Sequence, residues 1–305
     1  MQTTQHVLMI RPAHFAGNEQ TATSNYFQQL GGQSNNAHQQ ALLEFNALVE
    51  ALTRAGVIVN VIDDTPQPHK PDALFPNNWV SFHADGAAVL YPMQAINRRH
   101  ERRMEVLQQL NERGYHIHQL IDLSPHETAE QFLEGTGSLV LDREHRIAYA
   151  CLSPRTDVNV LADFSQRLDY ELVVFNATDE KGQAIYHTNV LMCVGEKFAV
   201  LCVDAIVQHE RQGVLHALQS TGHEIVEISL PQLNCFAGNM LQLRNGEGHL
   251  LVAMSRTAFD SLTPEQRVRL EALGDQLLVA AIPTIEKLGG GSVRCMIAEI
   301  FLPHT

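Results

Sequence analysis

The sequence has few cysteines, few basic residues and no long apolar run. Its five cysteines are an odd number without a C-x-x-C pair, which argues against a disulfide framework and predicts reduced thiols. No apolar run approaches the roughly 20 residues that cross a bilayer, and residues 1–6 lack the basic and apolar regions of a signal peptide. These absences predict a cytoplasmic location and no membrane partner.

The charge balance excludes another class of partner. Acidic residues outnumber basic ones, 34 to 21, and the formal net charge is −13. Because binding to nucleic acid relies on clustered Lys and Arg, we expect no nucleic-acid partner. The 16 histidines are scattered without metal-ligand spacing, so no metal site is predicted. The dense basic run at 98–103 is typical of a solvated helix face, although a binding role stays open.

A helix followed by a strand recurs five times along the chain. Apolar residues at helical spacing, with glycine after most of the helices, predict this unit. The expected helices are 38–55, 99–113, 157–168, 206–221 and 263–274. The expected following strands are 57–62, 115–120, 171–175, 224–228 and 276–282.

Hairpins are predicted between these units, from strand-forming runs separated by turn residues. The expected pairs are 79–82 with 87–91, 138–141 with 146–150, 189–194 with 198–203, and 240–243 with 249–253. The last strand, 293–302, has no following partner, and the first, 6–11, has no preceding one. Pairing these two would complete a fifth hairpin and close a ring without an open edge.

The residues just before the five hairpins recur at intervals of 52 to 56 residues. They are Asn78, Glu134, His187, Asn239 and Cys295. A fixed interval of this size indicates five ββαβ modules around an axis, in one domain spanning residues 1–305. The alternative is an ordinary α/β sheet with irregular insertions.

In such a ring the five positions converge on one central cavity. Cys, His and Glu are the residue types of nucleophilic catalysis: a thiolate attacks, an imidazole carries protons, and a carboxylate orients groups. Taken singly, Cys295 fits a turn before a buried strand, His187 a structural histidine, and Glu134 an exposed loop carboxylate. Their shared register favours the catalytic interpretation.

Four short motifs carry a resemblance that covers nearly the whole chain. They are FPNN at 75–78, EGTG at 134–137, HTN at 187–189 and GGGSVRC at 289–295. As an ordered set they resemble the pentein superfamily of guanidine-modifying enzymes, which implies a five-bladed α/β propeller. The segments MIRP at 9–12, NEQTA at 18–22 and NYFQ at 25–28 look like the bacterial branch of citrulline-utilisation hydrolases.

The resemblance implies roles for particular residues and no cofactor. Cys295 matches the nucleophile, His187 the general acid/base, and Glu134 the carboxylate beside the reacting carbon. Arginine deiminases have aspartates at two positions where this sequence has Asn78 and Asn189. An asparagine both donates and accepts, so it suits a ureido group and favours citrulline over arginine. Compensation by a neighbour such as Asn77 would still allow arginine.

The resemblance also suggests groups for the amino-acid end of a small-molecule substrate. Asp72 is expected to bind the α-amine, and Arg99 and Arg155 the α-carboxylate. The competing interpretations are a solvated helix for Arg99 and a surface loop for Arg155. The polar segment 13–39 is the candidate for a mobile flap over the cavity. The sequence leaves open whether the chain forms a homo-oligomer.

The predicted reaction converts citrulline to ornithine, carbon dioxide and ammonia through a covalent intermediate on Cys295. Because the same Cys and His support other leaving groups, arginine deiminase, dimethylarginine hydrolase and amidinotransferase activities stay open. A non-catalytic binding protein on the same ring is the alternative from another class. The presence of Cys295, His187 and Glu134 together argues against it.

Overall fold

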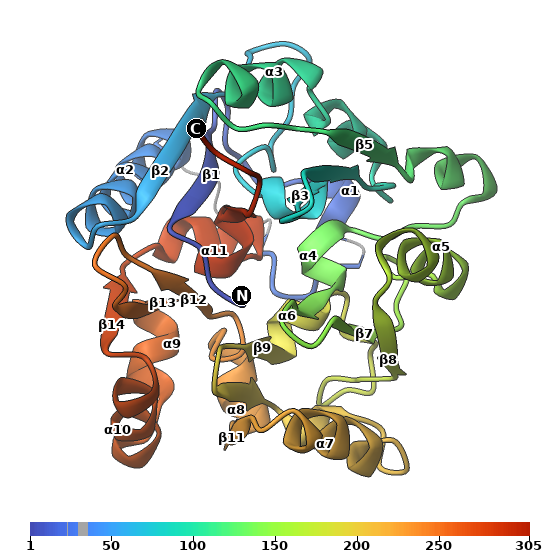
Figure 1. The fold of residues 1–305 in the computed structure, drawn as a ribbon, viewed down its shortest axis with the longest axis vertical. Coiled ribbons are helices and arrows are strands. Elements are labelled where there is room, and N and C mark those ends of the chain that lie inside the picture. Colours follow the sequence, from blue (N-terminus) through green and yellow to red (C-terminus); the bar gives the residue numbers. More distant parts are fainter. Residues whose placement is uncertain (23, 30–35) are drawn as a thin grey trace.

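Five three-stranded sheets surround a central axis in the computed structural model, which describes residues 1–22, 24–29 and 36–305 (Figure 1). In every sheet the middle strand pairs antiparallel with one neighbour and parallel with the other. Four sheets consist of consecutive strands: β3 Val80–Phe82, β4 Ala87–Leu90 and β5 Gln119–Asp122; β6 Val140–Asp142, β7 Ile147–Cys151 and β8 Glu171–Phe175; β9 Met192–Val194, β10 Phe198–Leu201 and β11 Glu224–Glu227; β12 Leu241–Arg244, β13 Leu250–Ser255 and β14 Gln276–Ala280.

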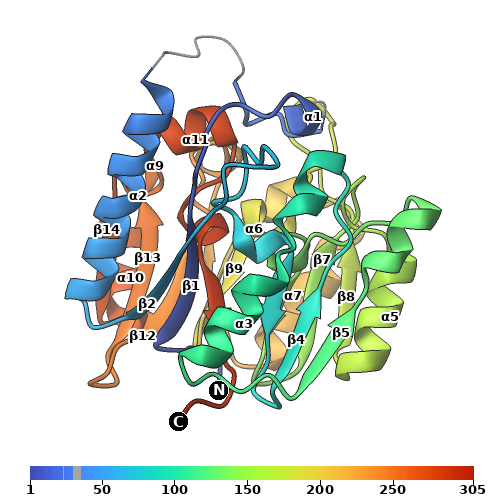
Figure 2. The ribbon, with the colours of Figure 1, turned by 90° about the horizontal axis from the view of Figure 1, so that it is seen from above.

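The fifth sheet joins the two ends of the chain, as predicted. Strand β1 (His6–Arg11) pairs antiparallel with β15 (Ala298–Ile300) and parallel with β2 (Ile58–Asp63). The ring therefore closes through backbone hydrogen bonds between the first and last strands, and both termini lie at one end of the molecule (Figure 2). The predicted five-bladed pentein propeller is confirmed.

The longer helices lie on the outer rim, whereas the short helices Gly135–Ser138, Thr188–Leu191 and Pro283–Gly289 lie nearer the axis (Figure 1). The rim helices include α2 Ala37–Arg54, α3 Met104–Glu112, α5 Val158–Leu168, α7 Arg211–Ser220 and α10 Pro264–Leu273. The remaining α-helices are α1 Glu19–Ala22, α4 Gly135–Ser138, α6 Thr188–Leu191, α8 Leu230–Asn234, α9 Arg256–Ser261 and α11 Pro283–Gly289. Single 3-10 segments cover Pro76–Asn78, Ile96–Glu101, Ser124–Ala129, Val203–Ala205 and Val293–Met296.

Local sequence accounts for the rim helices. In α10 the Thr263 hydroxyl accepts from the Gln266 backbone N–H and the Gln266 side chain accepts from the Thr263 N–H, which is the predicted capping box. In α2 the side chains of Phe45, Leu48 and Leu52 are fully buried on one face. Burying each contributes about 1.5–3 kcal/mol relative to exposure, so this face holds the helix on the ring.

Five predicted boundaries are wrong, because a short helical turn occupies the residues where another element was expected to begin. The helix expected at 99–113 begins at Met104, because Ile96–Glu101 forms a separate 3-10 turn. The strands expected to begin at residues 79, 138, 189 and 293 begin instead at Val80, Val140, Met192 and Ala298, because a short helical turn precedes each. Backbone bonds such as Val190 N–H to His187 O, 3.2 Å, close these turns and direct the preceding side chains toward the axis.

No helix within the described residues is long and apolar enough to cross a membrane.

Candidate active site

A narrow cleft opens into the ring at the end where α1 and α11 lie, opposite the termini (Figure 2). Side chains from α1 and from turns and loops that adjoin several of the sheets converge there, as the repeat predicts. The residues that line it are Thr21, Asn25, Asp72, Phe75, Asn78, Arg98, Arg155, Tyr186, His187, Gly289, Gly290, Gly291 and Cys295.

Cys295 lies at the bottom of this cleft and is only 4% exposed. Its Sγ is 3.3 Å from Asn239 Nδ2 and 3.7 Å from Asn189 Nδ2. Burial raises the pKa of the thiol, whereas the Ser292 backbone and the Asn239 side chain lower it. The sulfur is thus surrounded by neutral amide groups, and its ionisation depends on them.

His187 and Glu134 form a hydrogen-bonded pair, with 2.9 Å between Nε2 and Oε2. Burial alone would raise the pKa of Glu134, but Arg155, His187 and Arg98 together hold it well below its usual range. Because the ionised carboxylate can only accept, the imidazole hydrogen lies on Nε2 and Nδ1 is left as an acceptor. Burial lowers the pKa of His187 to about 4 despite Glu134, so the imidazole is neutral near pH 7 and its Nδ1 carries no proton.

Gly137 allows His187 and Asn78 to approach each other. A Cβ on Gly137 would lie 2.7 Å from His187 Nδ1 and closer still to Asn78 Nδ2. Such contacts are shorter than van der Waals separation, so only glycine fits between the two side chains. Gly137, the second glycine of the EGTG motif, therefore determines how closely these two side chains of the cleft approach each other.

The orientation of Asn78 follows from its neighbour Arg98. Arg98 Nη1 donates to Asn78 Oδ1 at 3.0 Å, and a guanidinium can only donate. The amide nitrogen must then point the other way. Within the described part of the chain, Asn78 Nδ2 is buried and has no hydrogen-bond partner, so the cleft contains an unused donor.

The Asn189 side chain also lies beside the Cys295 thiol. Its Nδ2 donates to the Thr136 backbone carbonyl at 3.2 Å, and its Oδ1 is 3.9 Å from Cys295 Sγ. The structure therefore brings together Cys295, His187, Glu134, Asn78 and Asn189, the five central residues that the sequence singled out.

Asp72 and Arg155 also line the cleft. Asp72 Oδ2 accepts from Asn18 Nδ2 at 2.7 Å, while Asp72 Oδ1 is buried without a partner among the described residues. Burial raises the pKa of Asp72, against the charge of Arg98. Arg155 lies over the Tyr186 ring and donates to the Thr21 carbonyl at 3.0 Å, which ties α1 to the cleft.

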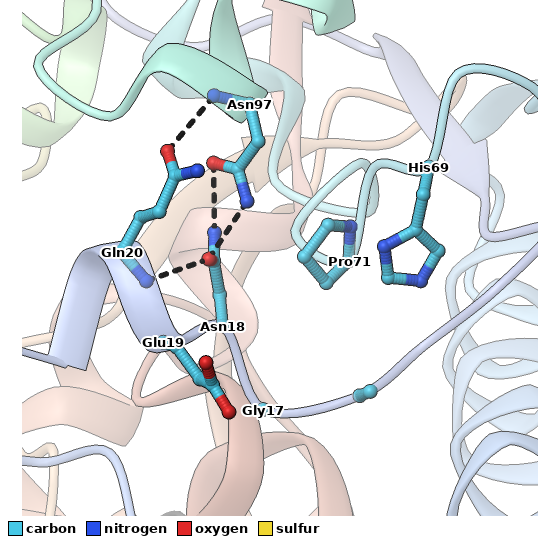
Figure 3. A pocket seen from close by; sticks show the side chains of 8 residues that line it. Gly17, Asn18, Glu19, Gln20, His69, Pro71 and Asn97 are labelled. Atoms are coloured by element: carbon cyan, nitrogen blue, oxygen red, sulfur yellow. Dashed lines mark hydrogen bonds between the residues drawn. The ribbon is translucent and has the colours of Figure 1, made fainter.

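A second pocket, of about 330 Å³, is lined by residues that include Asn18, Gln20 and Asn97 (Figure 3). Asn97 Nδ2 donates to Asn18 Oδ1 at 2.8 Å, and Asn18 Nδ2 in turn donates to Asp72. The Asn18–Asp72 pair thus separates the two spaces. Part of the predicted flap segment 13–39 forms this wall, and residues 23 and 30–35 of that segment lie outside the described residues.

Arg99 does not line the cleft, and the adjacent Arg98 does. Arg99 Nε donates to the Met93 carbonyl at 3.0 Å and lies 3.4 Å from a Glu127 oxygen. Arg98 is buried and makes two 2.9 Å bonds to Glu101. The phase of the 3-10 turn Ile96–Glu101 selects the inward arginine, and a predicted α-helix beginning at 99 could not reveal it.

Sequence reasoning also missed Asn18, Tyr186 and a role for Asn239. Asn239 occupies one of the five repeat positions, and this signal was available. Asn18 and Tyr186 become visible only through contacts distant in sequence. Among the described residues, no group of three His, Cys, Asp or Glu side chains is placed to hold a metal ion.

The five-sheet ring and its polar axis define the class of protein as the pentein superfamily. A family model described as N,N dimethylarginine dimethylhydrolase, eukaryotic, matches residues 11–302, and the chain belongs to this family. A sequence comparison with curated proteins gives no match.

Solved structures of the same fold include two of ArgZ, an arginine dihydrolase from the ornithine-ammonia cycle in cyanobacteria. The apo structure is 16% identical with a TM-score of 0.77, over 98% of this chain and 41% of that chain. The N-terminal domain bound to substrate is 16% identical with a TM-score of 0.76, over 97% and 99%. A dimethylarginine dimethylaminohydrolase adduct with S-methyl-L-thiocitrulline is 16% identical with a TM-score of 0.65, over 98% and 100%. At these identities the likeness shows the fold alone.

Proposed function

We propose that this protein hydrolyses citrulline to ornithine, carbon dioxide and ammonia through a covalent intermediate on Cys295. The observation that supports it most is the orientation of Asn78. Arg98 occupies Asn78 Oδ1, so Asn78 offers the cleft an N–H donor. A donor at this point matches a ureido oxygen, which accepts.

The same donor is unfavourable for a guanidinium. A guanidinium has only N–H groups on its nitrogens, so it would meet the Asn78 N–H without an acceptor, and the positive Arg98 lies directly behind. Exchanging a charged hydrogen bond for a neutral one forfeits roughly 1–2 kcal/mol, and leaving donors unpaired in a buried site adds to this. Asn189 Oδ1 can accept from the terminal ureido N–H₂.

In the proposed reaction Cys295 Sγ forms a bond to the ureido carbon, and the bond from that carbon to the δ-nitrogen of ornithine breaks. His187 Nδ1 accepts the thiol proton and passes it to the departing nitrogen. The product on the enzyme is an S-carbamoyl cysteine. Water then attacks the carbamoyl carbon, its proton passes through His187 to the thiolate, and the released carbamic acid decomposes to carbon dioxide and ammonia.

Glu134 holds His187 in the tautomer that this sequence requires, through the 2.9 Å bond to Nε2. At the other end of the substrate, Asp72 is assigned to the α-amine because Oδ1 is its unpartnered oxygen within the described residues. Arg155 is assigned to the α-carboxylate. Arg99 receives no role at the substrate, because, unlike Arg155, it does not line the cleft; its guanidinium contacts Met93 and Glu127.

A second candidate is arginine dihydrolysis, in which arginine itself is converted to ornithine. Its support is the fold likeness to ArgZ, described as an arginine dihydrolase, together with the acidic Asp72 in the cleft lining and the buried carboxylate of Glu134 bound to His187 beside it. Both reactions end in ornithine, but arginine dihydrolysis releases two ammonia molecules per ornithine. Dimethylarginine is the third substrate to test, from the family model.

The deciding experiment incubates the purified protein separately with citrulline, arginine and dimethylarginine, and measures amino-acid products by mass spectrometry and ammonia by an enzymatic assay. Ornithine from citrulline, with one ammonia each and arginine unconsumed, supports the proposal. Ornithine from arginine with two ammonia molecules supports the second candidate. Citrulline accumulating from arginine or dimethylarginine would refute both. Cys295→Ala serves as the inactive control.

A further inference from the structure

Asn239 contacts the sulfur of Cys295 without lining the cleft. It is fully buried, precedes β12, and is absent from the lining of the cleft. Its Nδ2 is 3.3 Å from Cys295 Sγ and 2.9 Å from the Asn189 backbone oxygen, and its Oδ1 is 3.1 Å from the Arg294 backbone nitrogen. The Asn239 side chain therefore contacts the Cys295 sulfur and the backbone of both Asn189 and Arg294.

The two backbone partners determine which way the amide points. The Asn189 carbonyl can only accept, and the Arg294 N–H can only donate. Rotating the Asn239 amide by 180° would place oxygen against oxygen and nitrogen against nitrogen, and both bonds would be lost. One Nδ2 hydrogen is thus used by Asn189, and the second is directed at Cys295 Sγ.

Other groups around the sulfur are less suited to this task. Asn189 Nδ2 is farther from it, at 3.7 Å, and already donates to Thr136. The Arg294 guanidinium is bound to Glu299 at 2.8 Å and to the Ile297 carbonyl. The titratable groups on the cleft side of Cys295 are Tyr186, His187, Arg98, Arg155 and Asp72. Tyr186 donates its hydroxyl to Gly290 O, and His187 is paired with Glu134.

We infer that Asn239 is a positioning residue that stabilises the Cys295 thiolate with a fixed N–H donor and sets the direction of Sγ. This role rests on the proposed function only in taking Cys295 as the nucleophile. A hydrogen bond to a charged acceptor is stronger than one to a neutral acceptor, so the Asn239 donor favours the thiolate over the thiol. Removing it should raise the ionisation midpoint of Cys295 by about one to two pH units.

The test measures the rate of Cys295 alkylation by iodoacetamide from pH 6 to 10, with peptide mass spectrometry to separate it from the other four cysteines. Asn239→Ala removes the donor, and Asn239→Ser is a second variant that keeps a small polar group. The matched control is Asn60→Ala, which removes another buried asparagine, bound to Tyr115 at 2.7 Å in a different sheet. The pH profile of kcat and the KM for citrulline are measured on the same proteins.

In Asn239→Ala we expect the midpoint of Cys295 alkylation to rise by about one to two pH units. The pH profile of kcat should shift by the same amount, and the KM for citrulline should stay within about twofold of that of the unmodified protein. Asn60→Ala should show the same alkylation midpoint as the unmodified protein. A folded Asn239→Ala with an unchanged midpoint would overturn the inference. Failure of both Asn239 variants to fold would assign the residue to stability and also overturn it. The alkylation readout needs no substrate, so a protein inactive on citrulline but shifted in alkylation refutes citrulline hydrolysis alone.

Discussion

Replacing Asn78 with aspartate would test the substrate assignment at a single atom. The carboxylate would keep an acceptor toward Arg98 Nη1, now 3.0 Å from Asn78 Oδ1, and would replace the Nδ2 donor with an oxygen. A citrulline ureido oxygen would lose one hydrogen bond and meet a second acceptor. An unsatisfied buried acceptor costs about 1–3 kcal/mol, which corresponds to a fall of roughly 5- to 150-fold in kcat/KM. The kcat/KM for arginine, whose guanidinium donates hydrogen bonds, should rise relative to the kcat/KM for citrulline.

The assay compares ornithine formation from citrulline and consumption of arginine under identical conditions. Asn46→Asp is the matched control, because it makes the same charge change on the exposed face of α2, where Asn46 accepts from Arg11. The control should retain the activity and preference of the unmodified protein. Citrulline turnover by Asn78→Asp within twofold of the unmodified rate, with no gain on arginine, would refute the donor argument.

Three further outcomes are expected. Cys295→Ala should abolish turnover while the thermal unfolding midpoint changes little, and measurable ornithine formation by it would refute the covalent mechanism. Gly137→Ala should lower kcat/KM at least tenfold, because its Cβ would lie 2.7 Å from His187 Nδ1; steady-state kinetics with circular dichroism would show whether activity falls in a folded protein. Burial lowers the pKa of His187 to about 4 and that of His83 well below its usual range. The unfolded chain therefore binds more protons below pH 6.5, and stability should fall as pH decreases from about 7 to 5; a thermal midpoint constant over this range would contradict it.

Most of the fold could be predicted from sequence because its determinants are local and repeated. Helical spacing of apolar residues, glycines after helices and strand-forming runs recur five times, and each signal acts within one module. The pairing of 6–11 with 293–302 followed from counting unpaired strands, and β1 with β15 confirms it. Element boundaries near the axis were misplaced, because the one-turn helices there are formed by glycine-rich motifs that lack an apolar period.

The central side chains could be predicted for the same reason. Cys295, His187, Glu134 and Asn78 occupy equivalent positions of a repeat, so symmetry of the ring brings them together without knowledge of individual contacts. Asn239 occupies the remaining position, yet the sequence assigned it no role, because its contacts with Asn189 and Cys295, 50 and 56 residues away, depend on the fold.

The sequence by itself determined the ring, its closure and the residue types on its axis, since these depend on periodicity and local propensity. Tertiary structure alone decided which of two adjacent arginines, Arg98 or Arg99, faces the cleft, because one residue in a 3-10 turn rotates the direction of a side chain by about a third of a turn. It also decided which end of the Asn78 and Asn239 amides faces the reaction. An amide has a donor and an acceptor on the same carbon, and only partners fixed by distant parts of the chain distinguish them.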